Sequence, residues 1–293
     1  MKLKLFHTLP LFALLAGCTQ QQPAPAPPAA NVQGAQFPND DLDRPVNLSA
    51  PAQRVVVIGP GAVETMFAIG AQKQLVGRDN YATIPPAAKE VAIAGDFQGP
   101  NVEKAVALRP DLVIVQGETY DKGRAKNWQE KIGVPVAVLT ARDLKMVRDD
   151  IFKIGQWTGK IDQARQVAAT LNIPAASKAG PKAFIEIGRS PLYTAGPDTL
   201  VGNVIEAAGY TNVAQIKGYQ PYNIESLLAA PPDVYIATSD KPKAQIVAEL
   251  RKSPTLSKLD CIQKGRVIVI NGDLILRPGP RLKQGIEKLR ELR

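Results

Sequence analysis

Histidine and cysteine are almost absent from this chain of 293 residues, and their scarcity excludes several kinds of chemistry. The only histidine is His7, and the only cysteines are Cys18 and Cys261. Without further histidines the chain cannot build a Ser-His-Asp triad, a histidine acid–base pair or the usual zinc and copper ligand sets. We therefore expect no enzymatic activity, no cofactor of its own and no resident metal site, and we interpret Cys261 as a small buried apolar residue.

Aromatic residues are also few, at 5% of the chain, and no long run of one charge sign occurs. The formal net charge is +9, but basic residues are spread among acidic ones. A stacking platform for single-stranded nucleic acid is therefore not evident, and nucleic acid is not an expected partner. The basic surplus is interpreted as a solvated surface with room for an anionic ligand or membrane headgroups.

Residues 1–17 have the composition of a secretory signal peptide. Lys2 and Lys4 precede an apolar run that is too short to span a bilayer as mature structure. The tetrad Leu15-Ala16-Gly17-Cys18 resembles the bacterial lipoprotein signal, which implies cleavage before Cys18 and lipidation of its sulfur. Two or more acyl chains anchor a protein stably. The alternative is an ordinary signal peptide that happens to contain a cysteine.

Residues 18–48 are rich in proline, alanine and glutamine and have little to bury. Such a segment stays extended and acts as a semi-rigid spacer. A lipidated cysteine followed by a spacer predicts an extracytoplasmic body tethered to a membrane, in a periplasm or on the outer face of the cell membrane.

One stretch of the chain occurs twice, at 101–114 and 223–236. In each copy an asparagine (Asn101, Asn223) is predicted to cap a short helix, and a glutamate two positions later (Glu103, Glu225) lies in the first turn, where the helix dipole favours a negative charge. A Pro-Asp pair then ends the helix, and an apolar run predicts a buried strand. The repeat favours a duplicated, two-lobed architecture, although such units are common in α/β proteins.

Helical and strand patterns alternate along the rest of the body, which predicts an α/β fold with parallel sheets. Residues 54–58 predict a strand, followed by Gly59-Pro60-Gly61 and a helix. This start is similar to a dinucleotide-binding turn, but Glu64 occupies the position of the third glycine, where a carboxylate would repel a pyrophosphate. We expect an N-terminal lobe at 49–141, a connecting helical segment at 142–173 and a C-terminal lobe at 174–293.

Together these segments resemble the substrate-binding lipoproteins of ABC importers that carry cobalamin, ferric siderophores or haem, and especially the cobalamin-binding members. The matching pieces are Asn101-Val102-Glu103, Leu108 to Ile114, Thr194-Ala195-Gly196, Ala208-Gly209, Asn212-Val213-Ala214, Glu225 to Leu228, Pro232-Asp233 and Arg277 to Arg281. The resemblance implies two Rossmann-like lobes with parallel sheets, joined by a single long helix, with a ligand cleft between the lobes.

The resemblance also implies roles for particular residues. In each lobe one surface glutamate, Glu103 or Glu225, would dock onto the permease dimer; the alternative is that both only complement helix dipoles. Six residues would bind the ligand, namely Tyr81, Phe97, Tyr193, Tyr219, Asp273 and Arg277. Each aromatic among them could instead be ordinary packing. Two departures weaken the cobalamin interpretation: tryptophans of the cobalamin-binding members are absent at Phe97 and Tyr219, and the helical connection is several residues shorter.

Other ligands stay open at this point. Haem iron would accept Tyr81, Tyr193 or Tyr219 as an axial ligand. A siderophore with carboxylates would suit bidentate pairing with an arginine, for which Arg78, Arg189, Arg277 and Arg281 are available.

From the resemblance we expect a monomeric, membrane-anchored binding protein that captures a corrinoid or a ferric siderophore and delivers it to an ABC importer. A haem-binding protein is the alternative within the same class. The competing classes are an extracytoplasmic enzyme on the same scaffold and a signalling protein that presents the same ligand to a receptor.

Overall fold

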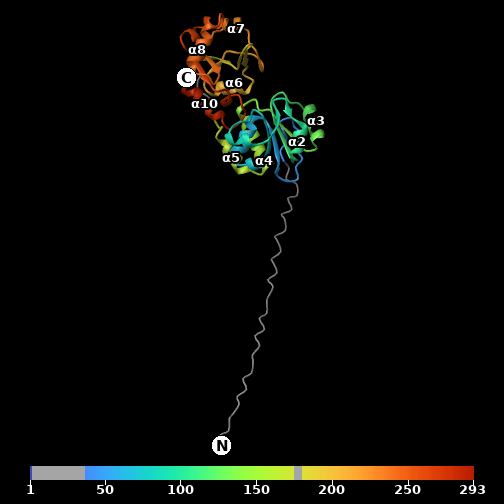
Figure 1. Cartoon of the computed structure of the whole chain (residues 1–293). Coiled ribbons are helices and arrows are strands. Elements are labelled where there is room, and N and C mark those ends of the chain that lie inside the picture. Colours follow the sequence, from blue (N-terminus) through green and yellow to red (C-terminus); the bar gives the residue numbers. More distant parts are fainter. Residues whose placement is uncertain (2–36, 175–179) are drawn as a thin grey trace. The chain divides into compact units, whose positions relative to one another are not determined.

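The computed structural model describes Met1 and residues 37–174 and 180–293. The rest of the predicted signal, Cys18 and most of the predicted linker lie outside the described residues. The described residues from 37 onward belong to one compact unit. We call the elements up to β6 the N-terminal lobe and the elements from β7 onward the C-terminal lobe. In the sequence α4 and α5 come between them, and Figure 1 shows both helices in the same body as α2 and α3.

The N-terminal lobe is built on a six-stranded sheet in the order β4-β3-β2-β1-β5-β6, parallel except for the short β3–β4 pair. Its strands are β1 (Val55–Ile58), β2 (Leu75–Asp79), β3 (Ile93–Asp96), β4 (Gly99–Pro100), β5 (Leu112–Gln116) and β6 (Val136–Leu139). Its helices are α1 (Pro60–Ala68), α2 (Val102–Ala107) and α3 (Lys122–Ile132). All four residues of β1 and of β6 are buried, as expected for parallel strands covered on both faces.

The C-terminal lobe contains a four-stranded parallel sheet in the order β10-β7-β12-β13 and a three-stranded antiparallel sheet in the order β11-β9-β8. The strands are β7 (Lys182–Glu186), β8 (Gly188–Arg189), β9 (Leu192–Ala195), β10 (Thr211–Asn212), β11 (Tyr219–Pro221), β12 (Val234–Thr238) and β13 (Val267–Ile270). The helices are α6 (Leu200–Ala207), α7 (Ile224–Ala229), α8 (Lys243–Lys252), α9 (Asp260–Gln263) and α10 (Leu282–Glu291). The predicted α/β architecture with parallel sheets is confirmed.

The two copies of the repeated stretch form the same local structure. Asn101 caps α2 by accepting from the Lys104 amide at 3.0 Å, and Asn223 caps α7 by accepting from the Glu225 amide at 2.7 Å. The repeated aspartate then tethers the start of the neighbouring strand: Asp111 accepts from the Gln53 and Arg54 amides, and Asp233 accepts from the Lys182 amide. Each copy therefore joins a capped helix to two adjacent parallel strands.

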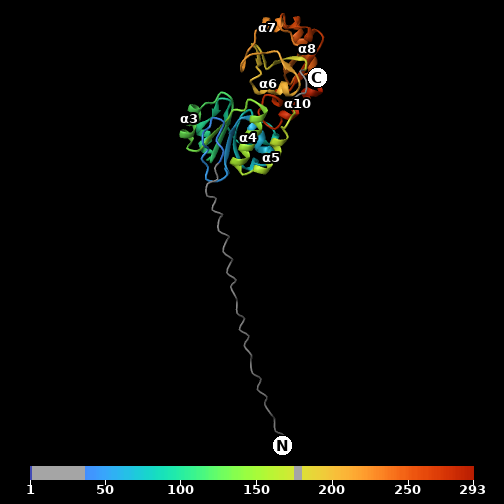
Figure 2. The same ribbon diagram turned by 180° about the vertical axis from the view of Figure 1, so that it is seen from behind.

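The connection between the lobes consists of two helices, α4 (Leu144–Thr158) and α5 (Ile161–Ala169), where the resemblance implied a single long one. Gly159 ends α4 in the left-handed conformation (φ 70°), a conformation that glycine adopts without a steric penalty. The helices lie side by side in both views (Figure 1 and Figure 2), and a Cβ at Gly155 of α4 would stand 2.2 Å from the Cβ of Ala164. The absence of a side chain at Gly155 therefore lets the two helices approach closely beside the turn at Gly159.

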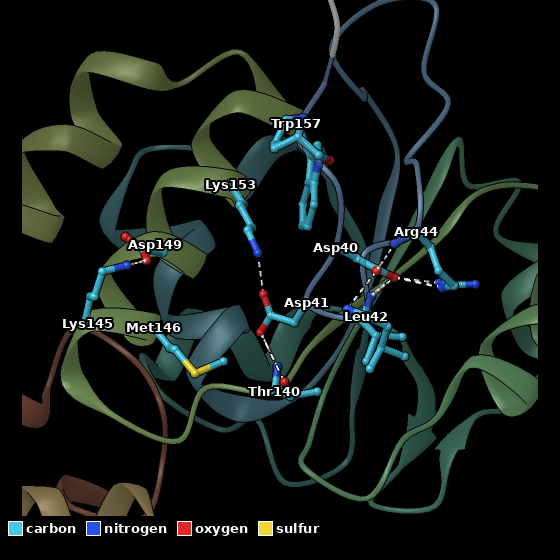
Figure 3. A network of polar contacts seen from close by, with 12 residues as sticks. Asp40, Asp41, Leu42, Arg44, Thr140, Lys145, Met146, Asp149, Lys153 and Trp157 are labelled. Atoms are coloured by element: carbon cyan, nitrogen blue, oxygen red, sulfur yellow. Dashed lines mark hydrogen bonds and ion pairs between the residues drawn. The ribbon is translucent and has the colours of Figure 1, made fainter.

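Residues 37–46 run along the exposed edge of the N-terminal sheet. The Asp41 amide donates to the Val138 carbonyl at 2.9 Å, and Asp40 accepts from the Val138 amide. Figure 3 shows that Asp41 also accepts from Thr140 and forms an ion pair with Lys153 of α4. These contacts cover the edge strand β6, which would otherwise present free backbone groups. The body therefore begins before residue 49, because this part of the predicted linker is held by the sheet edge.

The largest hydrophobic cluster contains residues of both lobes. Val57 and Ile114 contribute from the N-terminal sheet, Ile185 and Ile236 from the C-terminal sheet, and Trp157 from α4. At one point even the backbones touch, because a Cβ built on Gly61 of α1 would lie 2.2 Å from the Pro278 carbonyl oxygen. The lobes therefore share one core, and their separation would expose apolar surface.

Replacing Gly61 tests this backbone contact. Alanine would normally favour a helix over glycine, but here its methyl group must displace the Pro278 carbonyl, so we expect Gly61→Ala to reduce the free energy of unfolding by about 1–3 kcal/mol. The matched control is Gly123→Ala, also the second residue of its helix, where the nearest obstacle is a side-chain oxygen of Asp121 at 3.2 Å. Urea unfolding of both variants measures the difference; equal stabilities would contradict the close approach.

Candidate functional site

A cavity of about 670 Å³ lies between the two lobes. Its N-terminal wall is formed at the carboxyl ends of parallel strands, by the last residues of three of them: Ile58 of β1, Asp79 of β2 and Gln116 of β5. Leu200 and Tyr219 contribute from the C-terminal lobe. In open α/β sheets this end of the strands is where ligands bind, and the volume is within the range of ~300–1,000 Å³ found for small-molecule sites.

Five of the six ligand-binding residues predicted from the resemblance line this cavity: Tyr81, Phe97, Tyr219, Asp273 and Arg277. Tyr193 does not line it. Its side chain lies on β9, and its hydroxyl donates to the Tyr219 carbonyl at 2.9 Å, so it supports the neighbouring strand β11. Its hydroxyl contact lies within the antiparallel pair of β9 with β11, and its contact with a ligand stays a prediction.

The most exposed rings of the cavity are Phe97, at 69% relative exposure, and Tyr81, at 52%. Their centroids are 6.3 Å apart and their planes are inclined by 56°. Phe97 is held in place through its backbone, since its carbonyl accepts from the Tyr120 hydroxyl at 3.0 Å. Two large apolar surfaces thus face solvent at a cavity, which is a feature of ligand-binding sites.

Tyr219 is more enclosed than the other two rings. Burial raises its pKa to about 12, and the nearby Glu118 carboxylate acts in the same direction. The phenol therefore stays neutral at physiological pH and is available as a hydrogen-bonding group beside its apolar ring.

Asp79 is a functional position that the sequence reasoning missed. Its buried carboxylate accepts from the Gly59 amide at 2.9 Å, from the Tyr81 amide at 2.8 Å and from the Ala82 amide at 3.0 Å. The side chain thereby ties the turn after β1 to the loop that carries Tyr81.

Glu64 argues against nucleotide binding, and in the structure it also joins the two lobes. It lies on α1 with 4% exposure, and Arg281 of the C-terminal lobe donates to both of its oxygens, at 2.8 and 2.7 Å. Arg277 contacts it at 3.4 Å and pairs with Asp273 at 2.7 Å. The predicted ligand contacts Asp273 and Arg277 are thus paired with each other and anchored to the opposite lobe.

Gln116 makes a second link across the lobes. Its Oε1 atom accepts from the Ala62 amide at 2.9 Å, while its Nε2 atom donates to the Pro278 carbonyl at 2.8 Å. Ala62 lies on α1 and Pro278 lies in the C-terminal lobe. The Gln116 side chain therefore holds the two lobes together where all three residues meet beside the cavity.

The four arginines considered for siderophore carboxylates all donate to protein acceptors. Arg78 is buried and donates to the carbonyls of Asp79, Ala88 and Lys89. Arg189 pairs with Glu186 and Glu249. As Arg277 and Arg281 are held by Glu64, a ligand carboxylate would have to compete with an existing partner at each position.

The two glutamates predicted to dock onto a permease lie outside the cavity. Glu103 and Glu225 are exposed, and each is in the first turn of its capped helix, α2 or α7. No ion pair within the described residues involves either carboxylate.

Two further observations concern metals and membranes. Among residues 37–174 and 180–293, no group of three or more His, Cys, Asp or Glu side chains is arranged to hold a metal ion. No helix in the same part of the chain combines the length and the apolar character needed to cross a membrane.

Two α/β lobes with a preformed cavity at the carboxyl ends of their strands define a protein that binds a ligand between its lobes. Residues 55–274 match the periplasmic binding protein family, and the chain therefore belongs to that family. Because its members are binding proteins, the expectation that the chain is not an enzyme is confirmed by this membership.

Several relatives cover almost the whole chain. A cobalamin-binding protein of Halobacterium salinarum is 27% identical over 314 aligned positions, which span 97% of this chain and 83% of the relative. YvrC of Bacillus subtilis, an uncharacterised ABC transporter substrate-binding lipoprotein, is 28% identical and spans 95% of this chain and 92% of its own. The crystal structure of a periplasmic haem-binding protein from Pseudomonas aeruginosa is 30% identical, with a TM-score of 0.69 over 82% of this chain and 91% of the other.

The ion pair between the lobes can be tested by removing its charge. We expect Glu64→Gln to lower the free energy of unfolding by about 3 kcal/mol, because Arg277 and Arg281 would lose the buried carboxylate that compensates them. The control Glu130→Gln removes an exposed carboxylate that lies 3.8 Å from Lys126 on α3 and should cost less than ~1 kcal/mol. If urea unfolding gave the two variants the same stability, Glu64 would not hold the lobes together.

Proposed function

We propose that the chain is the solute-binding protein of an ABC importer and that its ligand is a corrinoid of the cobalamin type. The observation that carries this proposal is the pair of exposed rings, Tyr81 and Phe97, at a cavity that Tyr219 lines from the other lobe. Aromatic side chains on both sides of a cavity suit a flat, bulky macrocycle. The cobalamin-binding relative in Halobacterium salinarum, which spans 97% of this chain, supports the same ligand class.

The polar groups of the cavity support a ligand with neutral amide side chains, as corrinoids have. Arg277 is the arginine that lines the cavity, and its guanidinium forms ion pairs with Asp273 and Glu64. Haem and many ferric siderophores carry carboxylates, which would have to displace these partners. Amides need only hydrogen-bonding groups, and the hydroxyls of Thr119 and Thr140 lie in the cavity wall.

Haem is the second candidate, and one observation favours it. Tyr81 is half exposed at the cavity, and a tyrosine can serve as an axial ligand of haem iron. The haem-binding protein of Pseudomonas aeruginosa is 30% identical to this chain. A ferric siderophore without free carboxylates would suit the same aromatic cavity and belongs in the same binding test.

We also propose how the protein reaches its transporter. Glu103 and Glu225 would dock onto basic residues of a permease dimer, since the repeat displays one exposed carboxylate on equivalent helices of the two lobes. Charge complementarity of this kind sets orientation and association rate more than affinity. Lipidation of Cys18 would anchor the protein on the extracytoplasmic side of a membrane, as the name of the Bacillus subtilis relative suggests.

A titration of the full-length protein with cyanocobalamin, haemin and a ferric siderophore tests the ligand. We expect saturable binding of cyanocobalamin, and Phe97→Ala should weaken it about tenfold, or ~1.4 kcal/mol, because the ring surface is lost. Ile161→Ala, which shortens an exposed apolar side chain outside the cavity, is the control and should leave the affinity unchanged. If haemin alone bound and Tyr81→Phe abolished its binding, the corrinoid would be ruled out as the ligand and haem would take its place.

The docking proposal has a separate test in cells that depend on uptake of the ligand. We expect Glu103→Arg combined with Glu225→Arg to abolish uptake and to leave ligand affinity intact, because neither side chain lines the cavity. Glu90→Arg combined with Glu287→Arg makes the same change of charge at two other exposed glutamates and should leave uptake normal. Normal uptake in the first double mutant would rule out docking through the repeated glutamates.

A further inference from the structure

The ionisable groups of the cavity are mainly acidic, although the whole chain carries a net charge of +9. The cavity is lined by one arginine, Arg277, and by four carboxylates, Asp79, Asp96, Glu118 and Asp273. The sign of charge inside the cavity is therefore opposite to that of the protein as a whole. A cavity with walls of low dielectric strengthens such a local field.

Three of the four carboxylates already have close partners in the protein. Asp79 accepts from three backbone amides, and Asp273 pairs with Arg277 at 2.7 Å. Asp96 accepts from the Gln98 amide at 2.8 Å. These interactions stabilise the three carboxylates in their present positions. A ligand would have to compete with them for the carboxylate oxygens.

Glu118 differs from the other three. Its ion pair is with Arg142 at 4.0 Å, which is beyond hydrogen-bonding distance. Its side chain retains 29% exposure, so it is partly withdrawn from water. Burial raises the pKa of this carboxyl; Arg142 and the Tyr219 hydroxyl oppose the shift, and Asp198 adds to it. Glu118 thus lies in the cavity as a carboxylate with weak compensation from the protein.

Its position lets it face a bound ligand from one lobe while the other lobe supplies the opposing groups. Glu118 follows β5 of the N-terminal lobe. Asp198, just before α6, and Tyr219, on β11, act on it from the C-terminal lobe. A positive group that entered between the lobes here would meet the Glu118 carboxylate and the neutral phenol of Tyr219, which both line the cavity.

We propose that Glu118 is a specificity-determining residue whose carboxylate pairs with a positively charged group of the ligand. The cavity then binds cationic and neutral macrocycles more tightly than anionic ones. The macrocyclic class rests on the proposed function, whereas the preferred charge rests on the cavity itself. A cation would supply a closer positive charge than Arg142 does, and a ligand carboxylate would be repelled by Glu118. The expected order of affinity is cationic, then neutral, then anionic, with about a tenfold step, equivalent to ~1.4 kcal/mol, between the first and the last.

The test uses two series of macrocycles whose members have similar size and different charge. The first contains aquacobalamin (cationic), cyanocobalamin (neutral) and a cyanocobalamin monocarboxylate in which one peripheral amide is hydrolysed to the acid (anionic). The second contains a zinc porphyrin with N-methylpyridinium groups and one with sulfonatophenyl groups. Absorbance or fluorescence titration of the full-length protein should give the proposed order in both series. In Glu118→Gln the advantage of the cationic member over the anionic member should fall by about tenfold. Glu90→Gln, the same change at an exposed glutamate outside the cavity, should keep the wild-type order.

The outcomes separate this inference from the proposed function. Corrinoids that bind with no dependence on charge would overturn the inference and leave the proposed function intact. A preference for the cationic porphyrin, with no binding of any corrinoid, would support the inference about charge and overturn the corrinoid as the proposed ligand. A wild-type order that Glu118→Gln does not alter would overturn the assignment to this residue. Binding of none of the five compounds would overturn both.

Discussion

The buried carboxylate of Glu64, held by two arginines of the opposite lobe, is the interaction on which the geometry of the cavity depends. Its partners Arg277 and Arg281 belong to the segment that also carries Pro278, and the Pro278 carbonyl contacts Gly61 of α1 and the amide of Gln116. A buried charge is costly unless it is fully compensated, so this arrangement is satisfied in one relative placement of the lobes. The hydrophobic cluster shared by both lobes acts in the same direction. The cavity is therefore preformed, and little free energy is needed to order it when a ligand arrives.

The cavity divides its side chains between two tasks. Asp79, Gln116 and Asp273 have their polar atoms engaged by the protein and serve to position the loops around them. Tyr81 and Phe97 have no comparable burial and present their rings to solvent. A rigid polar frame with exposed aromatic surfaces gives contact area and orientation at the same time. The same division explains why arginines, although plentiful in the chain, are not offered to the ligand.

The repeated stretch shows how one local solution serves both lobes. In each copy an asparagine caps a helix, a glutamate stands in its first turn and an aspartate tethers the neighbouring strand. All three interactions span short distances within one helix or one pair of adjacent strands, and they do not depend on what the cavity binds. The two exposed glutamates are consequently displayed in equivalent settings, which is the arrangement that a two-fold symmetric partner would need.

The sequence by itself determined the α/β class, the capped helices at Asn101 and Asn223, the buried strands after them and, through the resemblance, most of the aromatic lining. These features depend on periodicity, capping and turn chemistry, which act between residues close in the chain. The tertiary structure alone decided the division of the connecting helix at Gly159, the contact of the Tyr193 hydroxyl with the Tyr219 carbonyl and the partners of Glu64, Asp79 and Glu118. Glu64 and Arg281 are 217 positions apart, and no local pattern pairs them. Whether a buried charge is compensated depends on the groups that folding brings around it. Glu64 meets Arg281 of the other lobe, and Glu118 meets Arg142, just before α4, together with Tyr219 of the other lobe.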